Sequence, residues 1–223
     1  MKLMKNVFFY PGAENDCNIY VFDSELMVDA GTGRFFQVVK SSMTEEFDLS
    51  LLKTIFLTHR HFDHVGGTAK FRNLSSPKVI CHSSEEPFIR NGEQTYADLF
   101  SSSPKAITVD GTVRDGDVIK TKNFSFRVVH TPGHTEGSAC LYEPEQKILV
   151  SGDTLFDGSI GRTDMQGGSF ASIYRSIDRL GQMDIDYLLP GHGNPRLIKS
   201  TLMMRQILNA LENRSQVKRN DLR

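Results

Sequence analysis

The sequence has few cysteines, no long apolar run and no excess of charge of either sign. Cys17, Cys81 and Cys140 are its three cysteines and form no Cys-X-X-Cys pair, so we expect free, mostly buried thiols in a reducing compartment. No apolar run is long enough for a membrane span or a secretory signal, which predicts a cytoplasmic protein. The 26 basic and 27 acidic residues nearly cancel. We therefore expect a small-molecule substrate and no nucleic-acid or membrane partner.

The remaining composition is that of a folded protein. A hydrophobic share of 39% over 223 residues is enough for a real core and argues against disorder. Alternation and turn signals predict strands over 7–10, 18–22, 26–28, 54–57, 78–81, 107–109, 118–120, 124–129, 138–142, 147–150 and 187–189. They predict helices over 35–40, 68–73 and 170–180, with further helix starts at Ser83 and Asn194. The basic tail from Arg214 is expected to fray.

One stretch concentrates side chains of the kind that bind metals. Residues 59–64 contain three of the seven histidines and an aspartate, namely His59, His61, Asp63 and His64. The apolar run before them predicts a buried strand, and an extended backbone points residues at i and i+2 to the same side. Gly66 and Gly67 allow a tight bend into a helix. Imidazole and carboxylate together favour a divalent metal such as zinc, iron or manganese.

The same arrangement recurs later in the chain. A predicted strand leads into a Pro/Gly turn with His134, another ends at Asp153 after a glycine, and a third ends at His192 between glycines. Side chains from several strand ends can converge at one edge of a sheet core, where binding sites are commonly built. We therefore predict that these residues join the 59–64 stretch in one site.

Other polar residues near these clusters have two possible roles. Asp29, at a strand end beside glycines, either supports a metal site or caps a turn, and the turn role is favoured. His82 is favoured as a structural histidine over a ligand. His130 is favoured as a hydrogen-bonding residue beside the site. Residues 93–105 have little pattern and predict a mobile surface segment near the site.

Taken together, the motifs resemble those of the metallo-β-lactamase fold superfamily. Its HxHxDH motif is matched by residues 59–64, and its later histidine, bridging aspartate and last histidine are matched by His134, Asp153 and His192. Asp29 matches the early structural aspartate of the family. The resemblance implies an α+β fold, an αββα sandwich of two β-sheets flanked by helices. The halves, roughly 1–111 and 112–223, would form a single domain.

The resemblance also implies two metal sites. The first would be held by His59, His61 and His134, and the second by Asp63, His64 and His192, with Asp153 and a water or hydroxide bridging them. Two divalent ions, with zinc favoured and iron or manganese as alternatives, would supply a hydroxide at neutral pH. Asp63 would be the catalytic residue that orients this nucleophile and receives its proton.

Finer features resemble the short glyoxalase II-like hydrolases, which cleave thioesters of the hydroxyacyl-glutathione type. The matching residues are 151–156 and the Gly-Arg-Thr-Asp loop at 161–164, followed by Gly167 and Gly168. Arg162 and Asp164 would either brace the metal loop, which is favoured, or let Arg162 meet a substrate carboxylate. Full-length glyoxalase II enzymes carry a helical C-terminal domain with basic residues that bind glutathione, whereas only about thirty residues follow His192 here. A thiol carrier other than glutathione therefore stays open as an alternative.

Rival members of the superfamily differ in reaction class. Persulfide dioxygenases share the Gly-Arg-Thr-Asp loop and use one iron, so a mononuclear iron oxidoreductase is the main alternative. A lactonase or a nuclease is less favoured, and the large insert or basic arm of the nucleases has no counterpart here. The presence of all seven ligand positions favours a dinuclear metallo-hydrolase.

Overall fold

The architecture comes from a computed structural model that describes residues 1–196 and 206–210. Within these residues the first sheet has seven strands that neighbour one another in chain order: β1 (Lys2–Met4), β2 (Val7–Tyr10), β3 (Ile19–Phe22), β4 (Leu26–Val28), β5 (Thr54–Leu57), β6 (Lys78–His82) and β7 (Gly111–Val113). Strands β1 to β4 pair antiparallel, and β4 to β7 pair parallel. The sheet is therefore mixed.

The second sheet is also mixed. Within the same described residues it has five strands in the order β14 (Tyr187–Pro190), β11 (Ile148–Gly152), β10 (Ala139–Glu143), β9 (Ser125–His130) and β8 (Val118–Lys120). A small hairpin, β12 (Leu155–Phe156) with β13 (Ser159–Ile160), follows β11. Strands β9, β11 and β14 run in the same direction, because β9 and β11 are both antiparallel to β10 and β14 is parallel to β11. Their carboxyl ends therefore meet at one edge.

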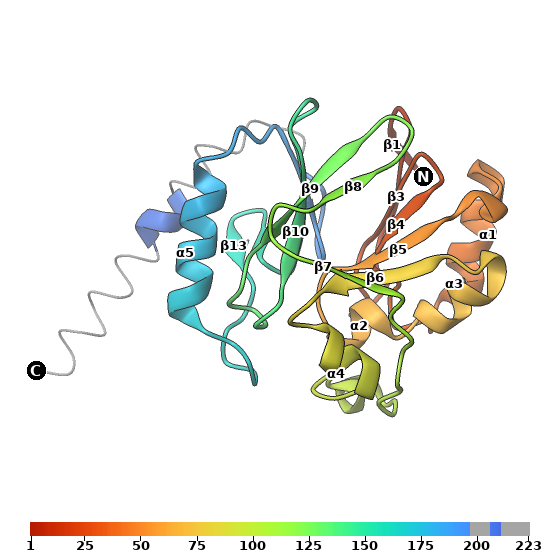
Figure 1. Ribbon diagram of the computed structural model, residues 1–223, viewed down its shortest axis with the longest axis horizontal. Helices are drawn as coiled ribbons and strands as arrows, with labels where there is room; N and C mark the ends of the chain where they lie inside the picture. Colours follow the sequence, from red (N-terminus) through yellow and green to blue (C-terminus); the bar gives the residue numbers. More distant parts are fainter. Residues whose placement is uncertain (197–205, 211–223) are drawn as a thin grey trace, which may run out of the picture.

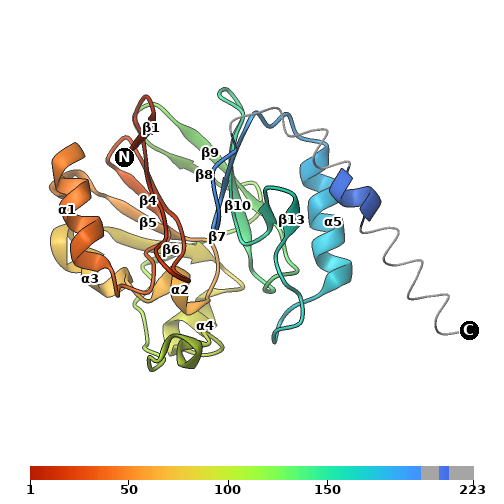
Figure 2. The ribbon, with the colours of Figure 1, turned by 180° about the vertical axis from the view of Figure 1, so that it is seen from behind.

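Helices cover the two outer faces of the sheets. Figures 1 and 2 show α1 (Phe36–Glu46) and α3 (Thr68–Ser75) beside the first sheet and α5 (Phe170–Gly181) beside the second, with both sheets between them. The remaining helical segments are α2 (Phe62–Val65), α4 (Glu86–Asn91), and the short 3₁₀ turns η1 (Leu49–Leu51) and η2 (Ala97–Phe100). This layering confirms the predicted αββα sandwich.

Strand alternation explains the layers. In β3, Val21 packs into the core between the first sheet and its helices, whereas Tyr20 and Phe22 pack into the core between the sheets. In β11, Val150 faces the core between the sheets and Leu149 faces α5. Because successive side chains point to opposite faces, a strand buried on both faces reads as a continuous apolar run.

Several predicted elements differ from the observed ones. The predicted strand at 107–109 is wrong, since the strand that pairs with β6 is Gly111–Val113. Val109 is buried in the core, which explains the apolar pattern there. The predicted helix at 35–40 extends to Glu46, and strand β1 and the β12–β13 hairpin were missed.

The last predicted helix does not begin at Asn194, since Arg196 pairs with Leu188 in an isolated β-bridge. The rest of this helix lies largely outside the described residues. Residues 206–210 are helical, and Ile207 is buried against α5 and the second sheet. The fraying expected from Arg214 concerns residues outside the described part of the chain.

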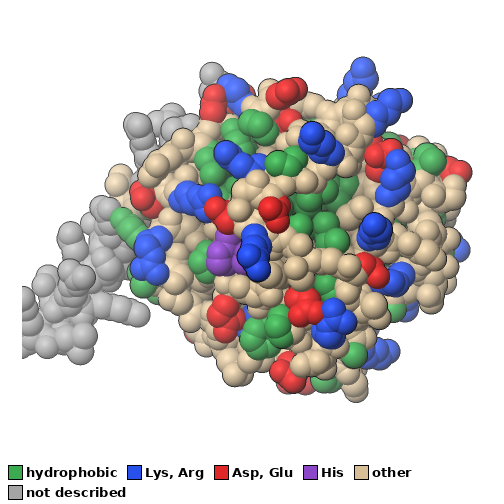
Figure 3. All heavy atoms as spheres, viewed as in Figure 1, with side chains coloured by type: hydrophobic (Ala, Val, Ile, Leu, Met, Phe, Trp, Pro, Cys, Tyr) green, Lys and Arg blue, Asp and Glu red, His purple; other side chains and the backbone are tan. Residues whose placement is uncertain are grey.

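The cysteines agree with the expectation from composition. Cys17, Cys81 and Cys140 are buried and free. In the described ranges, no helix has the length and apolar character needed to cross a membrane. On the face seen in Figure 3, basic and acidic side chains are interspersed. This face therefore shows no broad field of one sign.

We predict that Gly133→Ala destabilises the fold through the contact between the 131–137 loop and α5. Gly133 has φ +138°, and a Cβ there would lie 2.2 Å from the backbone nitrogen of Ile173. The expected loss is about 2–3 kcal/mol in the free energy of unfolding, measured by urea denaturation. Gly158→Ala is the control, because Gly158 has φ +83° but nothing within 4 Å of its Cβ position. Equal losses in both variants would contradict the clash.

Candidate metal centre

Seven side chains predicted from the motifs meet at the shared edge of the two sheets. The strands β5, β9, β11 and β14 end there, and short loops or the first turn of α2 present the side chains beyond each strand end. The residues brought together are His59, His61, Asp63, His64, His134, Asp153 and His192. The sheets touch at the same place, since the amide of Ala139 donates to the carbonyl of Thr58.

The first group consists of His59, His61 and His134. Their potential ligand atoms lie within 4.8 Å of one another, and all three side chains are buried. The Nε2 atom of His134 lies 2.9 Å from Nδ1 of His61, and the His59 ring centroid is 4.7 Å from each of the other two. Three imidazoles at this spacing match the donor set of a zinc or iron site.

The second group consists of Asp63, His64 and His192. Nε2 of His192 lies 3.0 Å from Oδ2 of Asp63, and Nε2 of His64 lies 3.6 Å from the same oxygen. The His64 side chain is fully buried, whereas that of His192 is 33% exposed. The second group is therefore the more open of the two.

Asp153 lies between the groups. Its Oδ1 is 3.3 Å from Nε2 of His64, and its Oδ2 is 3.6 Å from Nε2 of His134 and 3.8 Å from Nε2 of His192. One carboxylate thus approaches histidines of both groups, with Oδ2 near one histidine of each group and Oδ1 near His64. This is the position that a ligand shared by two metals would take.

Several polar atoms in the cluster are buried without a hydrogen-bond partner among the described residues, as expected for side chains that bind a metal. Nε2 of His59, Nε2 of His64 and Oδ1 of Asp153 are buried without a hydrogen-bond partner, although buried polar atoms are nearly always paired. Burial lowers the pKa of His59 well below its usual value, and the neighbouring His64 lowers it further. A neutral imidazole keeps its lone pair available to a cation. The buried His/Asp clusters are therefore consistent with a dinuclear metal site.

The charge states of His61 and Asp153 agree with this. Burial and the adjacent His134 lower the pKa of His61 to about 2. Burial alone would raise the pKa of Asp153, but the adjacent His64 and His134 hold it below its usual value. At neutral pH His59, His61 and Asp153 thus have the protonation states that metals require. For His64 and His192 burial lowers the pKa, but nearby groups that include Asp153 and Asp63 raise it above the usual value, so a metal would have to displace a proton from these two rings.

The opposite ring nitrogens are held by neighbouring groups. Nδ1 of His64 lies 2.8 Å from Oδ2 of Asp29, and Nδ1 of His134 lies 2.8 Å from the carbonyl of Arg162. Asp29 also accepts hydrogen bonds at 2.8 Å from the amide and hydroxyl of Thr58. These contacts fix the ring orientation and leave Nε2 of each ring directed into the cluster. Asp29 thus contacts the ring of His64 as well as the backbone of Thr58, so its role is not limited to the turn cap favoured from the sequence.

Cys17 forms a further group with Asp29 and His64, all three buried. Burial raises the pKa of the Cys17 thiol to about 12. A protonated thiol is a poor metal ligand, because the thiolate is the binding form. Nδ1 of His64 is moreover already held by Asp29. We therefore assign no metal to this group.

The structure places the remaining predicted residues around the cluster. Nε2 of His130 contacts the carbonyl of Glu136 at 2.9 Å, and its ring stacks on His82 at 4.0 Å. Neither histidine belongs to a ligand group within the described residues. Arg162 and Asp164 form a bidentate pair with both distances at 2.8 Å. This pairing favours the bracing role over a free arginine that awaits substrate.

The sequence analysis did not predict a buried ion pair that lies behind the ligands. Arg60 and Glu85 both have fully buried side chains, with Nη1 of Arg60 2.9 Å from Oε1 of Glu85. The amide of Arg60 donates to Oε2 of Glu85, while the hydroxyl of Thr135 and the amide of Gly137 donate to Oε1, each at 2.8 Å. Glu85 therefore joins the loop of His59 and His61 to the loop of His134.

Tyr96 is another residue that the sequence analysis did not single out. Its ring centroid lies 5.3 Å from that of His61, and its hydroxyl accepts a hydrogen bond from the amide of Gln166. Arg60 reaches the same two segments, because Nη2 contacts Oε1 of Gln94 at 2.8 Å and the carbonyl of Gln166 at 3.2 Å. The 93–105 segment thus lies beside the site, as expected.

We predict that Glu85→Gln lowers the free energy of unfolding by about 2–3 kcal/mol, because it leaves the buried Arg60 guanidinium without its main counter-charge. Metal content should fall as well, since the two ligand loops lose their common anchor. Glu136→Gln is the matched control, because Glu136 also contacts Arg60 but its side chain is 47% exposed. We expect under ~1 kcal/mol for the control. The free energy of unfolding would be measured by denaturation and the metal content by elemental analysis. Equal losses in both variants would contradict the prediction.

A pH prediction follows from His82. Burial and the stacked His130 lower the pKa of His82 to about 4, whereas the unfolded chain has a value near ~6.5. Between these values the unfolded state binds a proton that the folded state does not, so acidification destabilises the fold. The free energy of unfolding should fall less between pH 6.5 and 4.5 in metal-free His82→Gln than in the metal-free unmodified protein. Parallel pH profiles would contradict this, and metal binding at neutral pH should not change.

The chain is similar to known proteins in both sequence and fold. The model of the metallo-beta-lactamase superfamily matches residues 12–192. An uncharacterised protein of Aquifex aeolicus is 37% identical over 128 residues, which cover 56% of this chain and 60% of that protein. Hydroxyacylglutathione hydrolase GloC of Haemophilus influenzae is 30% identical over 174 residues, covering 74% of this chain and 80% of that protein.

Other relatives share the activity class or the fold. The protein named "Probable metallo-hydrolase MJ0888" of Methanocaldococcus jannaschii is 28% identical over 194 residues, covering 82% of this chain and 89% of that protein. The B3 metallo-beta-lactamase BLEG-1 superposes with a TM-score of 0.74 at 29% identity, covering 85% of this chain and 92% of that one. TTHA1623, in a di-iron-bound form, has a TM-score of 0.71 at 26% identity, with coverages of 85% and 94%.

The site and the comparisons lead to one family. The His-rich clusters and the relatives named as metallo-hydrolases support metal-dependent hydrolysis as the activity class. The match over residues 12–192 shows that the chain belongs to the metallo-β-lactamase superfamily.

Proposed function

We propose that this protein is a dinuclear metallo-hydrolase that cleaves a thioester of the hydroxyacyl-glutathione type. The position of Asp153 carries the dinuclear part, because its two oxygens approach histidines of both groups. The relative GloC, named a hydroxyacylglutathione hydrolase, supports the substrate class. TTHA1623, crystallised with two irons, supports two metals on a similar scaffold.

Each of the two groups would hold one metal ion. His59, His61 and His134 would hold one divalent cation in the buried group, and Asp63, His64 and His192 a second in the more open group. Two such cations would lower the pKa of water and polarise the carbonyl that is attacked. Zinc, iron and manganese all accept this mixture of imidazole and carboxylate.

Asp63 would act as the general base that transfers the proton of the attacking water. Its carboxylate is 11% exposed, lies in the open group and contacts Nε2 of His192 at 3.0 Å. There it can receive the proton that the attacking water loses and pass it to the departing thiolate, which leaves as a thiol. A carboxylate within hydrogen-bond reach of the reacting water is suited to this general-base role.

We predict that purified protein holds close to two metals per chain and cleaves hydroxyacyl-glutathione under strict anaerobiosis. His59→Ala or His192→Ala should lower turnover by more than about 100-fold. Mutation of a residue that merely hydrogen-bonds to a metal ligand already lowers metal affinity or activity by ~10–100-fold, and the loss of a ligand itself should cost more. Both should also lower the melting temperature, because bound metal stabilises the folded state. Elemental analysis, thioester assay and thermal unfolding are the measurements.

His130→Gln is the control for these variants, because His130 lies beside the cluster without belonging to it. It should retain its metal and most of its turnover. One iron per chain, with oxygen consumed when a thiol persulfide is added, would replace the hydrolase proposal with the dioxygenase alternative. A β-lactam substrate should be assayed in parallel, given the fold shared with BLEG-1.

A further inference from the structure

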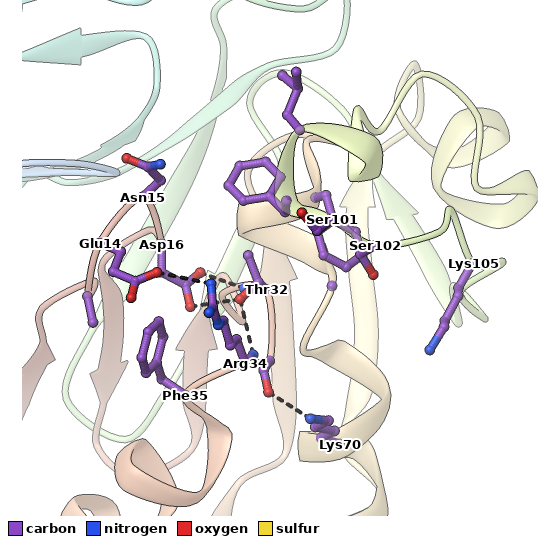
Figure 4. A pocket seen from close by; sticks show the side chains of 16 residues that line it. Glu14, Asn15, Asp16, Thr32, Arg34, Phe35, Lys70, Ser101, Ser102 and Lys105 are labelled. Atoms are coloured by element: carbon purple, nitrogen blue, oxygen red, sulfur yellow. Dashed lines mark hydrogen bonds and ion pairs between the residues drawn. The ribbon is translucent and has the colours of Figure 1, made fainter.

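A pocket next to the metal centre has no role in the steps described above. Its volume is about 550 Å³, which lies in the range of small-molecule sites. Its walls come from segments far apart in the sequence, mainly residues 13–16, 32–35 and 99–102, with Phe62 and Lys70 from α2 and α3 (Figure 4). Side chains from this many segments define a site rather than a crease within one loop.

Three of the chain segments that line the pocket also lead to the metal centre. Phe62 lines it from a position between His61 and Asp63. The segment that supplies residues 99–102 also supplies Tyr96, whose ring lies 5.3 Å from that of His61. The loop that supplies residues 13–16 ends at Asn18, whose amide group donates to the carbonyls of Pro190 and Gly193 on either side of His192. The pocket and the ligand loops are therefore built from adjoining parts of the chain.

The acidic groups of the pocket already have partners. The Asp16 carboxylate accepts hydrogen bonds from the amide and hydroxyl of Thr32, the second at 3.0 Å, and from the amide of Cys17 at 3.2 Å. Glu14 pairs with Arg34 at 3.1 Å. These contacts build the wall (Figure 4). Arg34 offsets the charge of Glu14, whereas the partners of Asp16 are neutral groups, so the cations that remain for an incoming anion are the lysines.

The lysines of the pocket lack such counter-charges. Lys105 has no hydrogen bond or ion pair with any described residue. Lys70 donates one hydrogen bond to the carbonyl of Gly33 at 2.7 Å and has no carboxylate partner in the described part of the chain. In Figure 4 both lysines lie on the side of the view opposite Phe35. Two ammonium groups beside a shared hollow attract a carboxylate or a phosphate.

Apolar side chains complete the lining. Phe62 and Phe100 contact each other with ring centroids 5.9 Å apart, and Leu99 is 63% exposed at the rim. Exposed large apolar groups around a polar hollow are typical of ligand sites. The lining thus suits an organic anion with an apolar portion, and it suits a cation or a purely apolar chain less well.

We propose that this pocket binds the anionic part of the thiol carrier, with Lys70 and Lys105 contacting its carboxylate or phosphate group. The proposal rests on the thioester hydrolysis proposed above. The carrier would occupy the pocket while its thioester lies over the cluster next to Asp63. Carrier recognition would then reside in the first half of the chain, where Phe62 lies between two of the metal ligands.

The test measures binding separately from hydrolysis. Calorimetry on the metal-loaded protein would use S-hexylglutathione and S-hexyl-coenzyme A, thioethers that cannot be hydrolysed and that offer carboxylates and phosphates respectively. The double variant Lys70→Gln/Lys105→Gln should raise the Kd of the better ligand about fivefold, as expected for two solvent-exposed ion pairs. The effect should shrink at high salt, and Lys70→Arg/Lys105→Arg should restore binding.

The matched control is Lys120→Gln/Lys122→Gln, which removes the same charge from exposed positions outside the pocket. It should leave the Kd unchanged. In the hydrolysis assay, Lys70→Gln/Lys105→Gln should have a higher KM for hydroxyacyl-glutathione and an unchanged kcat. The same acyl group on neutral N-acetylcysteamine should be cleaved equally by the variant and the unmodified protein.

The outcomes separate the two proposals. Lysine-dependent binding without hydrolysis of any thioester would uphold the pocket and overturn the proposed reaction. Hydrolysis with no thioether binding, or with equal losses in the pocket and control variants, would overturn the pocket and leave the reaction standing. The better of the two thioethers identifies the anion as carboxylate or phosphate.

Discussion

The buried ion pair between Arg60 and Glu85 is the constraint on which the site depends. Both side chains are fully buried, and desolvating two charges is favourable only when their remaining hydrogen bonds are satisfied. Here the loops that bear the ligands satisfy the carboxylate, because Glu85 accepts from Arg60, Thr135 and Gly137. The same bonds that stabilise the charges therefore hold His59, His61 and His134 at one spacing, and a loop that left its place would leave a buried charge unpaired.

The ligand cluster could be predicted from the sequence because its signal is local. Residues 59–64 place four ligand-type side chains within six positions, and His134, Asp153 and His192 each follow an apolar strand beside a glycine. Strand alternation and turn chemistry are enough to place such residues at strand ends. The layered fold itself came from the resemblance to a family, since periodicity does not determine which strands pair.

The features that were missed depend on contacts between distant residues. Glu85 looks like part of a helix start, and only the packed structure brings it to Arg60, 25 positions earlier. The supposed strand at 107–109 shows the opposite error. Val109 is apolar because it fills the core, whereas the backbone that pairs with β6 begins two residues later, at Gly111. Burial and strand pairing coincide in most strands, but a connecting segment can have the first without the second.

The tether between Asn18 and the loop of His192 has a consequence for the order in which the protein assembles. The side chain of Asn18 contacts the carbonyls of Pro190 and Gly193, and its backbone amide donates to Gly191. Contacts between such distant residues form late in folding, because a long loop must close first. A nascent chain that has emerged only as far as β11 thus has the motif histidines but not the last one. The open group is completed only when nearly the whole described chain has been synthesised, so hydrolytic competence would come after the sandwich has closed.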